Sequence, residues 1–134
     1  PKGDNMVDVN RDNRPLSPHL QVYRLPLAAI TSIVNRATGQ AMVAGLLLLS
    51  FWLLGAAVGG GMWECADWLT RSWFGFLVLL GSCWALWYHF LAGIRHFFYD
   101  AGEGLEIETA RKTSIAIIAG SVVLTLLSLI IYCL

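Results

Sequence analysis

The charged residues of this chain are clustered, and they leave three long stretches that contain no Asp, Glu, Lys or Arg. These stretches lie at residues 37–63, 72–94 and 113–134. Each one reaches the length of about 20 residues that a helix needs to cross a hydrocarbon core of about 30 Å. Helices suit this environment because they pair their own backbone polar groups. The pattern predicts three transmembrane helices, with approximate bounds of 29–58, 72–97 and 113–134.

The composition supports an integral membrane protein of the all-α class. Of the 134 residues, 57% are hydrophobic and 13% are charged, against about 25% charged in an average soluble domain. A soluble protein of this size has too little interior to hide so much apolar surface. Disordered chains are rich in charge and poor in aromatic residues, so disorder is excluded as well. The 9 basic and 9 acidic side chains provide no cationic field for nucleic acid.

The distribution of Lys and Arg predicts how the chain crosses the membrane. The loop between the first two spans carries only Arg71, whereas both segments on the other side carry several cations. These are Lys2, Arg11, Arg14, Arg24 and Arg36 before the first span, and Arg95, Arg111 and Lys112 between the second and third. The positive-inside rule therefore places the N-terminus and the second loop on the cytoplasmic or matrix side. The glycines at 59–61 are expected to end the first span and allow a turn.

Residues 1–25 are polar and form a segment separate from the anchor at 26–134. The segment lacks the apolar run of a signal peptide, and its aspartates do not fit a mitochondrial presequence. We expect either an arm on the inner face that contacts a partner, or a disordered tail. The missing presequence favours a bacterial plasma membrane over a mitochondrial inner membrane.

His89 lies inside the second predicted span, about 9 Å along the helix from Arg95 at the inner boundary. An ionisable residue at this depth indicates a functional site. It is either a neutral histidine that bonds between helices or an axial ligand of haem iron. Axial ligands approach opposite faces of a porphyrin, while His96 is on the same helix and His19 lies in the polar arm. A six-coordinate haem would thus need its second ligand from another polypeptide.

Ser32 and Arg36 form a second constellation, because their i, i+4 spacing places them on one face of a helix that begins near Pro26. The inner ends of the first two spans lie on the same side of the membrane, so these residues can converge with His89 and His96. Arg36 could hold a haem propionate or polarise a carbonyl oxygen, and Ser32 could hydrogen-bond one. Alternatively, Arg36 reaches lipid headgroups and Ser32 caps backbone.

The remaining polar residues indicate no further chemistry. The three cysteines form no C-x-x-C pair for a metal or cluster and no C-x-x-C-H site for covalent haem. The sequence also has no glycine-rich phosphate loop and no nucleophile with a neighbouring base. The chain is therefore not expected to oxidise a substrate by itself.

Two stretches resemble the cytochrome b subunit of succinate dehydrogenase, the larger of the two small membrane anchors of respiratory complex II. The first runs Arg14-Pro15-Leu16-Ser17-Pro18-His19-Leu20 and continues through Tyr23-Arg24 to residues 32–39. The second, residues 89–102, matches the family pattern H-x-x-x-G-[apolar]-R-H-[apolar]-x-[aromatic]-D-x-G at each position. Both stretches lie at the inner ends of predicted spans.

The resemblance implies roles for individual residues. His89 matches the axial ligand of haem b, and Ser32 and Arg36 match the serine and arginine of the ubiquinone site. Arg36 and His96 match residues that lie close to the haem propionates. The family usually has histidine before the arginine of the first motif, where this chain has Asn35, so the propionate contacts do not carry over there.

The implied function is electron transfer by a non-catalytic subunit of a membrane enzyme. A flavoprotein subunit would oxidise succinate, and an iron–sulfur subunit would pass electrons to ubiquinone. A second membrane anchor would share the single haem b, which would either buffer electrons or hold the two anchors together. Two other hypotheses remain open: a quinol:fumarate reductase anchor, and a structural or transport subunit without a cofactor.

Overall fold

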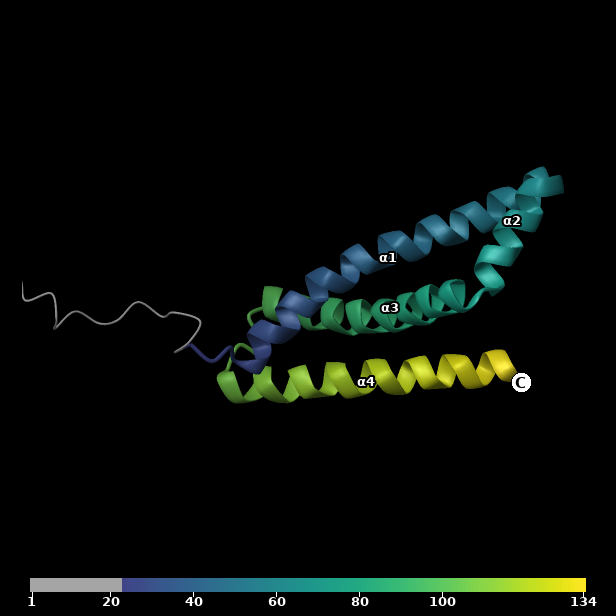
Figure 1. Ribbon diagram of the computed structural model, residues 1–134. Helices are drawn as coiled ribbons and strands as arrows, with labels where there is room; N and C mark the ends of the chain where they lie inside the picture. Colours follow the sequence, from purple (N-terminus) through teal and green to yellow (C-terminus); the bar gives the residue numbers. More distant parts are fainter. Residues whose placement is uncertain (1–22) are drawn as a thin grey trace, which may run out of the picture.

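The structure of the chain is a computed structural model that describes residues 23–134, and these residues form four helices. Their bounds are Leu27–Val58 for α1, Gly60–Arg71 for α2, Trp73–Asp100 for α3 and Ile107–Cys133 for α4 (Figure 1). By length and composition α1, α3 and α4 can each cross a membrane. The predicted all-α class with three spans is thus confirmed. Most of the predicted arm, including His19, lies outside the described residues.

The long helices extend beyond the charge-free stretches from which they were predicted. Helix α3 continues to Asp100 rather than ending near residue 97, and α4 begins at Ile107 rather than near residue 113. The first turns of α4 contain charged residues, and Lys112 Nζ lies 3.5 Å from Glu108 Oε1 at i, i+4 spacing. Hydropathy reports the part of a helix that lies in lipid, whereas charged turns can continue the helix into water.

A tight turn ends α1. The Gly59 amide donates to the Gly55 carbonyl at 2.8 Å, and Gly59 and Gly60 have φ values of 77° and 59°. Residues that carry a Cβ rarely adopt positive φ values, so glycine is suited to the turn between α1 and α2. The prediction that glycines end the first span is confirmed.

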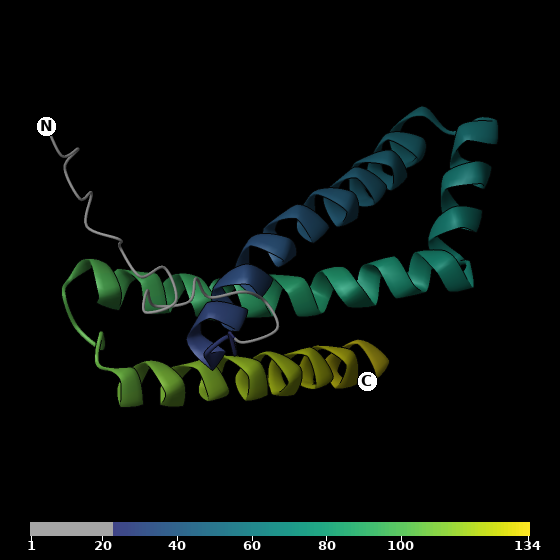
Figure 2. The same ribbon diagram turned by 60° about the vertical axis from the view of Figure 1, so that its left-hand side comes forward.

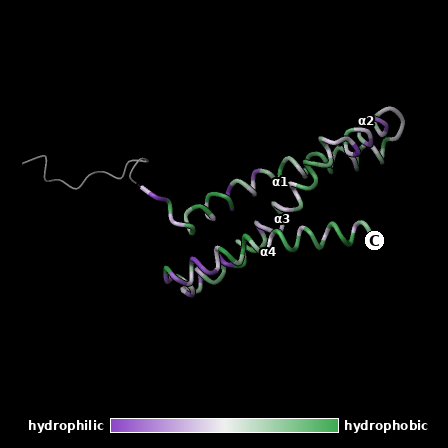
Figure 3. Tube along the Cα trace, turned by 60° about the horizontal axis from the view of Figure 1, so that its bottom comes forward, coloured by the Kyte–Doolittle hydropathy of each residue, from purple (hydrophilic) through white to green (hydrophobic). Residues whose placement is uncertain are grey.

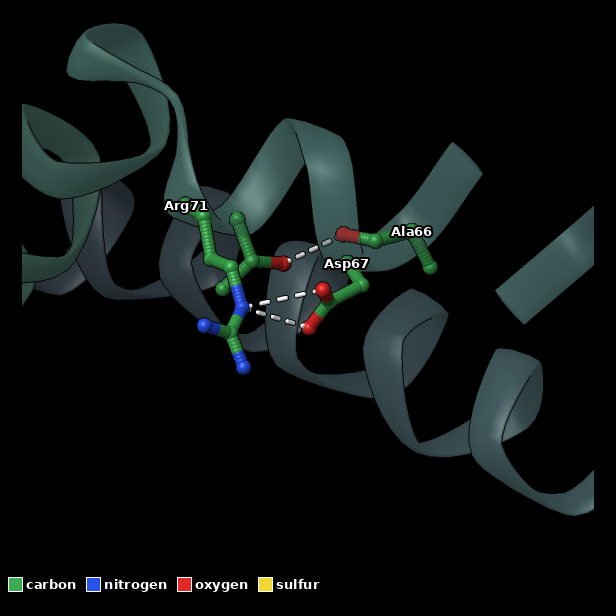
Figure 4. Close-up of polar contacts among 4 residues, drawn as sticks. Ala66, Asp67 and Arg71 are labelled. Carbon is green, nitrogen blue, oxygen red and sulfur yellow. Dashed lines mark hydrogen bonds and ion pairs between the residues drawn. The ribbon is translucent and has the colours of Figure 1, made fainter. Parts of the chain in front are cut away.

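Helix α2 is a feature that the sequence analysis missed, because the segment was expected to be a loop. Ala66 on α2 is buried against α1, where a Cβ on Gly55 would come within 2.9 Å of the Ala66 Cβ. Within α2, Arg71 Nε donates to Asp67 at 2.9 Å (Figure 4). The hydrogen bond and charge of Asp67 raise the pKa of Arg71 above its ordinary value. The segment is short and amphipathic, so a search for long apolar stretches passes over it.

Helix α3 lies between the other two long helices (Figures 1 and 2). It runs beside α4 along most of its length, while α1 crosses it at an angle and diverges toward the far end, where α2 bridges the two. We call this the α2 end. The opposite end, which holds the start of α1, the end of α3 and the start of α4, is the α3–α4 loop end.

Small and hydroxyl-bearing residues make the contacts between the long helices. A Cβ on Gly45 would overlap the Ser82 side chain, and Trp87 Nε1 donates to Ser128 Oγ at 2.9 Å. Most large apolar side chains are exposed instead, and apolar residues dominate the long helices away from the start of α4 (Figure 3). A soluble protein buries its large apolar side chains instead. In lipid, helices associate through close backbone approach and interhelical hydrogen bonds.

Candidate functional site

His89 contacts α1 through a backbone hydrogen bond. Its Nδ1 lies 3.1 Å from the carbonyl oxygen of Asn35, and the side chain is half-buried. A carbonyl oxygen can only accept, so Nδ1 carries the proton and donates it. In the neutral imidazole Nε2 then has a free lone pair, which is the state that binds a metal.

The contact at Asn35 bears on the departure from the family pattern. The His89 bond uses the backbone of Asn35 and is therefore independent of which side chain stands at this position. The Asn35 Oδ1 atom is buried and has no hydrogen-bond partner among residues 23–134. The exchange of histidine for asparagine thus leaves the bond that fixes the His89 tautomer intact.

Gly39 allows α1 to approach the imidazole. A Cβ at this position would lie 3.3 Å from His89 Cε1, which is closer than ordinary van der Waals contact. Gly39 follows Asn35 by one helical turn, so the two residues present adjacent backbone to His89. The glycine of the first motif is thereby explained by packing.

An open groove of about 630 Å³ lies beside His89. It is lined by Ile33, Arg36, Ala37, Gly39, Gln40 and His89. The predicted approach of Arg36 and His89 is therefore observed: both line one groove, although they come from different helices. Arg36 is exposed, and its Nε donates to the Ser32 carbonyl at 3.4 Å.

The other two predicted site residues lie outside this lining. Ser32 is half-buried and sits one turn before Arg36 on α1. His96 is exposed, and its ring meets Tyr99 edge-on with centroids 6.2 Å apart. His89 thus contacts α1, whereas His96, two turns later on α3, is exposed.

The residues of the groove fit a haem. They provide one imidazole whose Nε2 is not used by the Asn35 bond, one cation and an apolar wall formed by Ile33 and Ala37. Among residues 23–134, His89 is the one histidine that lines the groove. The described residues contain no group of three or more His, Cys, Asp or Glu side chains that could hold a metal ion.

Arg95 is a residue whose importance the sequence analysis missed, because it was counted as a boundary charge. The structure buries it to 6% exposure. Its Nη1 donates to Thr31 Oγ1 on α1 at 3.1 Å and to Ser114 Oγ on α4 at 3.0 Å. A signal was available, since Arg95 follows the buried Tyr88 and Ala92 at the spacing of one helix face.

A larger hollow of about 690 Å³ lies at the α2 end. Its walls include Trp52, Phe76, Cys83, Ser128 and Tyr132, with the Asp67–Arg71 pair at its side. None of the predicted site residues lines it.

The fold and the groove define a class of protein: a multi-pass helical membrane protein with one half-buried imidazole, that of His89, beside an open groove. Residues 10–128 match the succinate dehydrogenase/fumarate reductase transmembrane subunit family, and the chain belongs to this family. The resemblance inferred from the two motifs is confirmed.

Similarity to individual relatives extends over nearly the whole chain. The chain is 67% identical over 127 residues to the succinate dehydrogenase cytochrome b556 subunit of Paracoccus denitrificans, and the match covers 95% of this chain and 98% of the relative. The corresponding subunit of Rickettsia felis is 31% identical over 87% of this chain and 90% of its own. The mitochondrial cytochrome b560 subunit of Sus scrofa is 35% identical over 87% and 68%, respectively.

Proposed function

We propose that this chain is the haem-binding membrane anchor of a succinate:quinone oxidoreductase. In this proposal His89 is one axial ligand of a haem b, and Ser32 and Arg36 belong to a ubiquinone-reduction site. The observation that carries the proposal is the Nδ1 bond to the Asn35 carbonyl, because it leaves Nε2 free beside the groove. The names of the relatives, cytochrome b subunits of succinate dehydrogenase, support the same assignment.

Each residue of the site has a separate task in this proposal. The haem, when bound, supplies reversible one-electron chemistry at its iron. The Asn35 carbonyl holds the imidazole of His89 in one tautomer and orientation. The Arg36 guanidinium neutralises a propionate or polarises a quinone carbonyl. The Ser32 hydroxyl donates a hydrogen bond to that carbonyl oxygen.

The partners follow from what the groove does not contain. His89 is the one histidine of the described residues that lines it, and in this proposal a second membrane anchor supplies the other axial ligand and shares the haem. Electrons reach the quinone from a flavoprotein subunit that oxidises succinate, through an iron–sulfur subunit. The chain itself then binds and orients, and it performs no bond chemistry.

The charge distribution supports an orientation. Arg36, Arg111 and Lys112 belong to the α3–α4 loop end, whereas Arg71 is at the α2 end. The positive-inside rule then places the α3–α4 loop end on the cytoplasmic side of a bacterial plasma membrane. Residues 1–25 would lie on that side too, next to the soluble subunits.

A reduced-minus-oxidised absorption spectrum of the purified complex tests the ligand assignment. We expect a b-type haem band that is lost or shifted in His89→Ala. The matched control is Phe74→Ala, which removes an exposed aromatic side chain from the start of the same helix and should retain the haem. An unchanged spectrum in His89→Ala would refute the assignment, and absence of any haem band in the unaltered complex would favour a cofactor-free subunit.

Activity assays test the quinone site. Ser32→Ala and Arg36→Ala should lower quinone reduction by about tenfold or more, because each removes a polar contact to the quinone. Succinate oxidation with a soluble acceptor should persist, and the exposed Arg111→Ala should leave both activities unchanged. Equal loss of both activities in the site variants would point to failed assembly and contradict the assignment.

The family match also favours a second function, because it includes fumarate reductase anchors. A quinol:fumarate reductase would use the same groove with electrons flowing in the opposite direction. Turnover of the purified complex in the two directions, each with its own substrate pair, separates the two functions.

A further inference from the structure

The guanidinium of Arg95 joins the three long helices at one point. Its Nη1 bonds to Thr31 Oγ1 on α1 and to Ser114 Oγ on α4, and these two oxygens are 3.2 Å apart. Each hydroxyl also donates to a carbonyl of its own helix, Thr31 to Ala28 at 3.0 Å and Ser114 to Ala110 at 2.7 Å. Their hydrogens are thus committed to the backbone, and their lone pairs accept from Arg95.

A second bond from α3 holds the same turn of α1. Tyr88, which is 1% exposed, donates its hydroxyl to the Thr31 carbonyl at 3.0 Å. Tyr88 directly precedes His89, and Thr31 directly precedes Ser32. The two bonds therefore fix the depth of the turn that carries Ser32 relative to the helix that carries His89.

The burial of Arg95 makes the register of α1 on α3, meaning their relative position along the helix axes, hard to change. No carboxylate of the described residues lies within 4 Å of it, and its Nε is buried with no hydrogen-bond partner among them. Apart from the Tyr99 ring, 5.5 Å from its central carbon, the two hydroxyls are the groups that stabilise the charge. Sliding α1 or α4 along α3 would leave a buried cation without its hydrogen-bond partners, which is expensive.

We propose that Arg95 is a positioning residue that sets the register of α1 on α3, and so places Ser32 and Arg36 relative to His89 and the quinone. The inference rests on the proposed function of these three residues. It assigns to Arg95 an effect on quinone binding although Arg95 does not line the groove.

The test uses the complete complex and compares Arg95→Gln, Arg95→Lys and Thr31→Val with Arg111→Gln, which removes an exposed charge near the same end. Arg95→Gln should raise the quinone KM about tenfold, because a displacement of the order of 1 Å at a binding site is enough for this. Thr31→Val should raise it less, since Ser114 and the Tyr88 bond remain. Lysine keeps the charge and should restore part of the affinity, and Arg111→Gln should leave the KM unchanged.

Two further measurements separate positioning from general damage. Haem content and succinate oxidation with a soluble acceptor should be retained in Thr31→Val and Arg95→Lys. The low-spin haem signal in electron paramagnetic resonance should shift in Arg95→Gln, because displacement of Asn35 alters the bond that orients His89.

The inference is overturned if the quinone KM is unchanged in both Arg95→Gln and Thr31→Val, or if Arg111→Gln raises it equally. If Arg95→Gln does not assemble, the KM of Thr31→Val decides the question by the same criterion. Arg36→Ala keeps the inference separate from the proposed function. A raised KM in Arg36→Ala with no change in the two register variants refutes the inference alone, whereas no change in Arg36→Ala refutes the quinone site.

Discussion

If His89 binds haem as proposed, replacement of Gly39 by valine should weaken haem binding without removing any proposed haem contact. A Cβ at this position already lies 3.3 Å from His89 Cε1, and the two methyl groups of valine need still more space. Relief requires that α1 and the imidazole separate, which lengthens the 3.1 Å bond from Nδ1 to the Asn35 carbonyl. Loss of the hydrogen-bond partner behind a metal ligand typically costs about 10- to 100-fold in metal affinity.

Alanine at the same position should be milder. Its Cβ requires a shift of only a few tenths of an ångström, and the gain in helix propensity of up to about 1 kcal/mol offsets part of the strain. The expected order of haem affinity is therefore glycine, alanine and then valine. A matched control is Gly81→Val on α3, where a Cβ meets nothing within 4 Å in the described part of the chain.

Haem content per complex, measured during titration with haem or during its release, checks this prediction. Subunit content of each purified variant should be recorded alongside, so that loss of haem is not confused with loss of a partner. Full haem content and an unaltered spectrum in Gly39→Val would refute the reasoning, because they would show that the α1–His89 contact does not support the ligand. A similar loss in Gly81→Val would refute it too.

Two predictions concern the helix contacts. Gly45→Leu should destabilise the anchor by about 1–3 kcal/mol, since even a Cβ at Gly45 overlaps the Ser82 side chain; an unchanged thermal midpoint of the purified complex would contradict this packing. Arg71→Ala should leave the midpoint unchanged, because its ion pair with Asp67 is exposed and lies within one helix; a clear drop would indicate that a partner uses this pair.

The arrangement of the spans illustrates how far a sequence pattern reaches. The three charge-free stretches predicted three membrane helices, because lipid imposes a length and an apolar composition on any segment that crosses it. The same reasoning did not predict helix α2, because lipid imposes neither a length nor an apolar composition on a short amphipathic segment that does not cross it. The charged first turns of α4 were not predicted either, because a helix can continue beyond its apolar, membrane-crossing part.

The candidate site likewise has features that the sequence predicts and features that depend on how the helices pack. The sequence pattern alone was enough to predict the candidate site: an imidazole inside a predicted span, and an arginine and a serine one turn apart. The helix packing adds three facts that the pattern does not contain: the Asn35 carbonyl contacts His89, His96 is exposed, and Arg95 is buried. The physical reason is that rotation and depth of a helix in lipid are set by close contacts such as Gly39–His89 and Arg95–Thr31. Such contacts join residues far apart in the chain, and a hydropathy pattern, which describes one segment at a time, does not predict them.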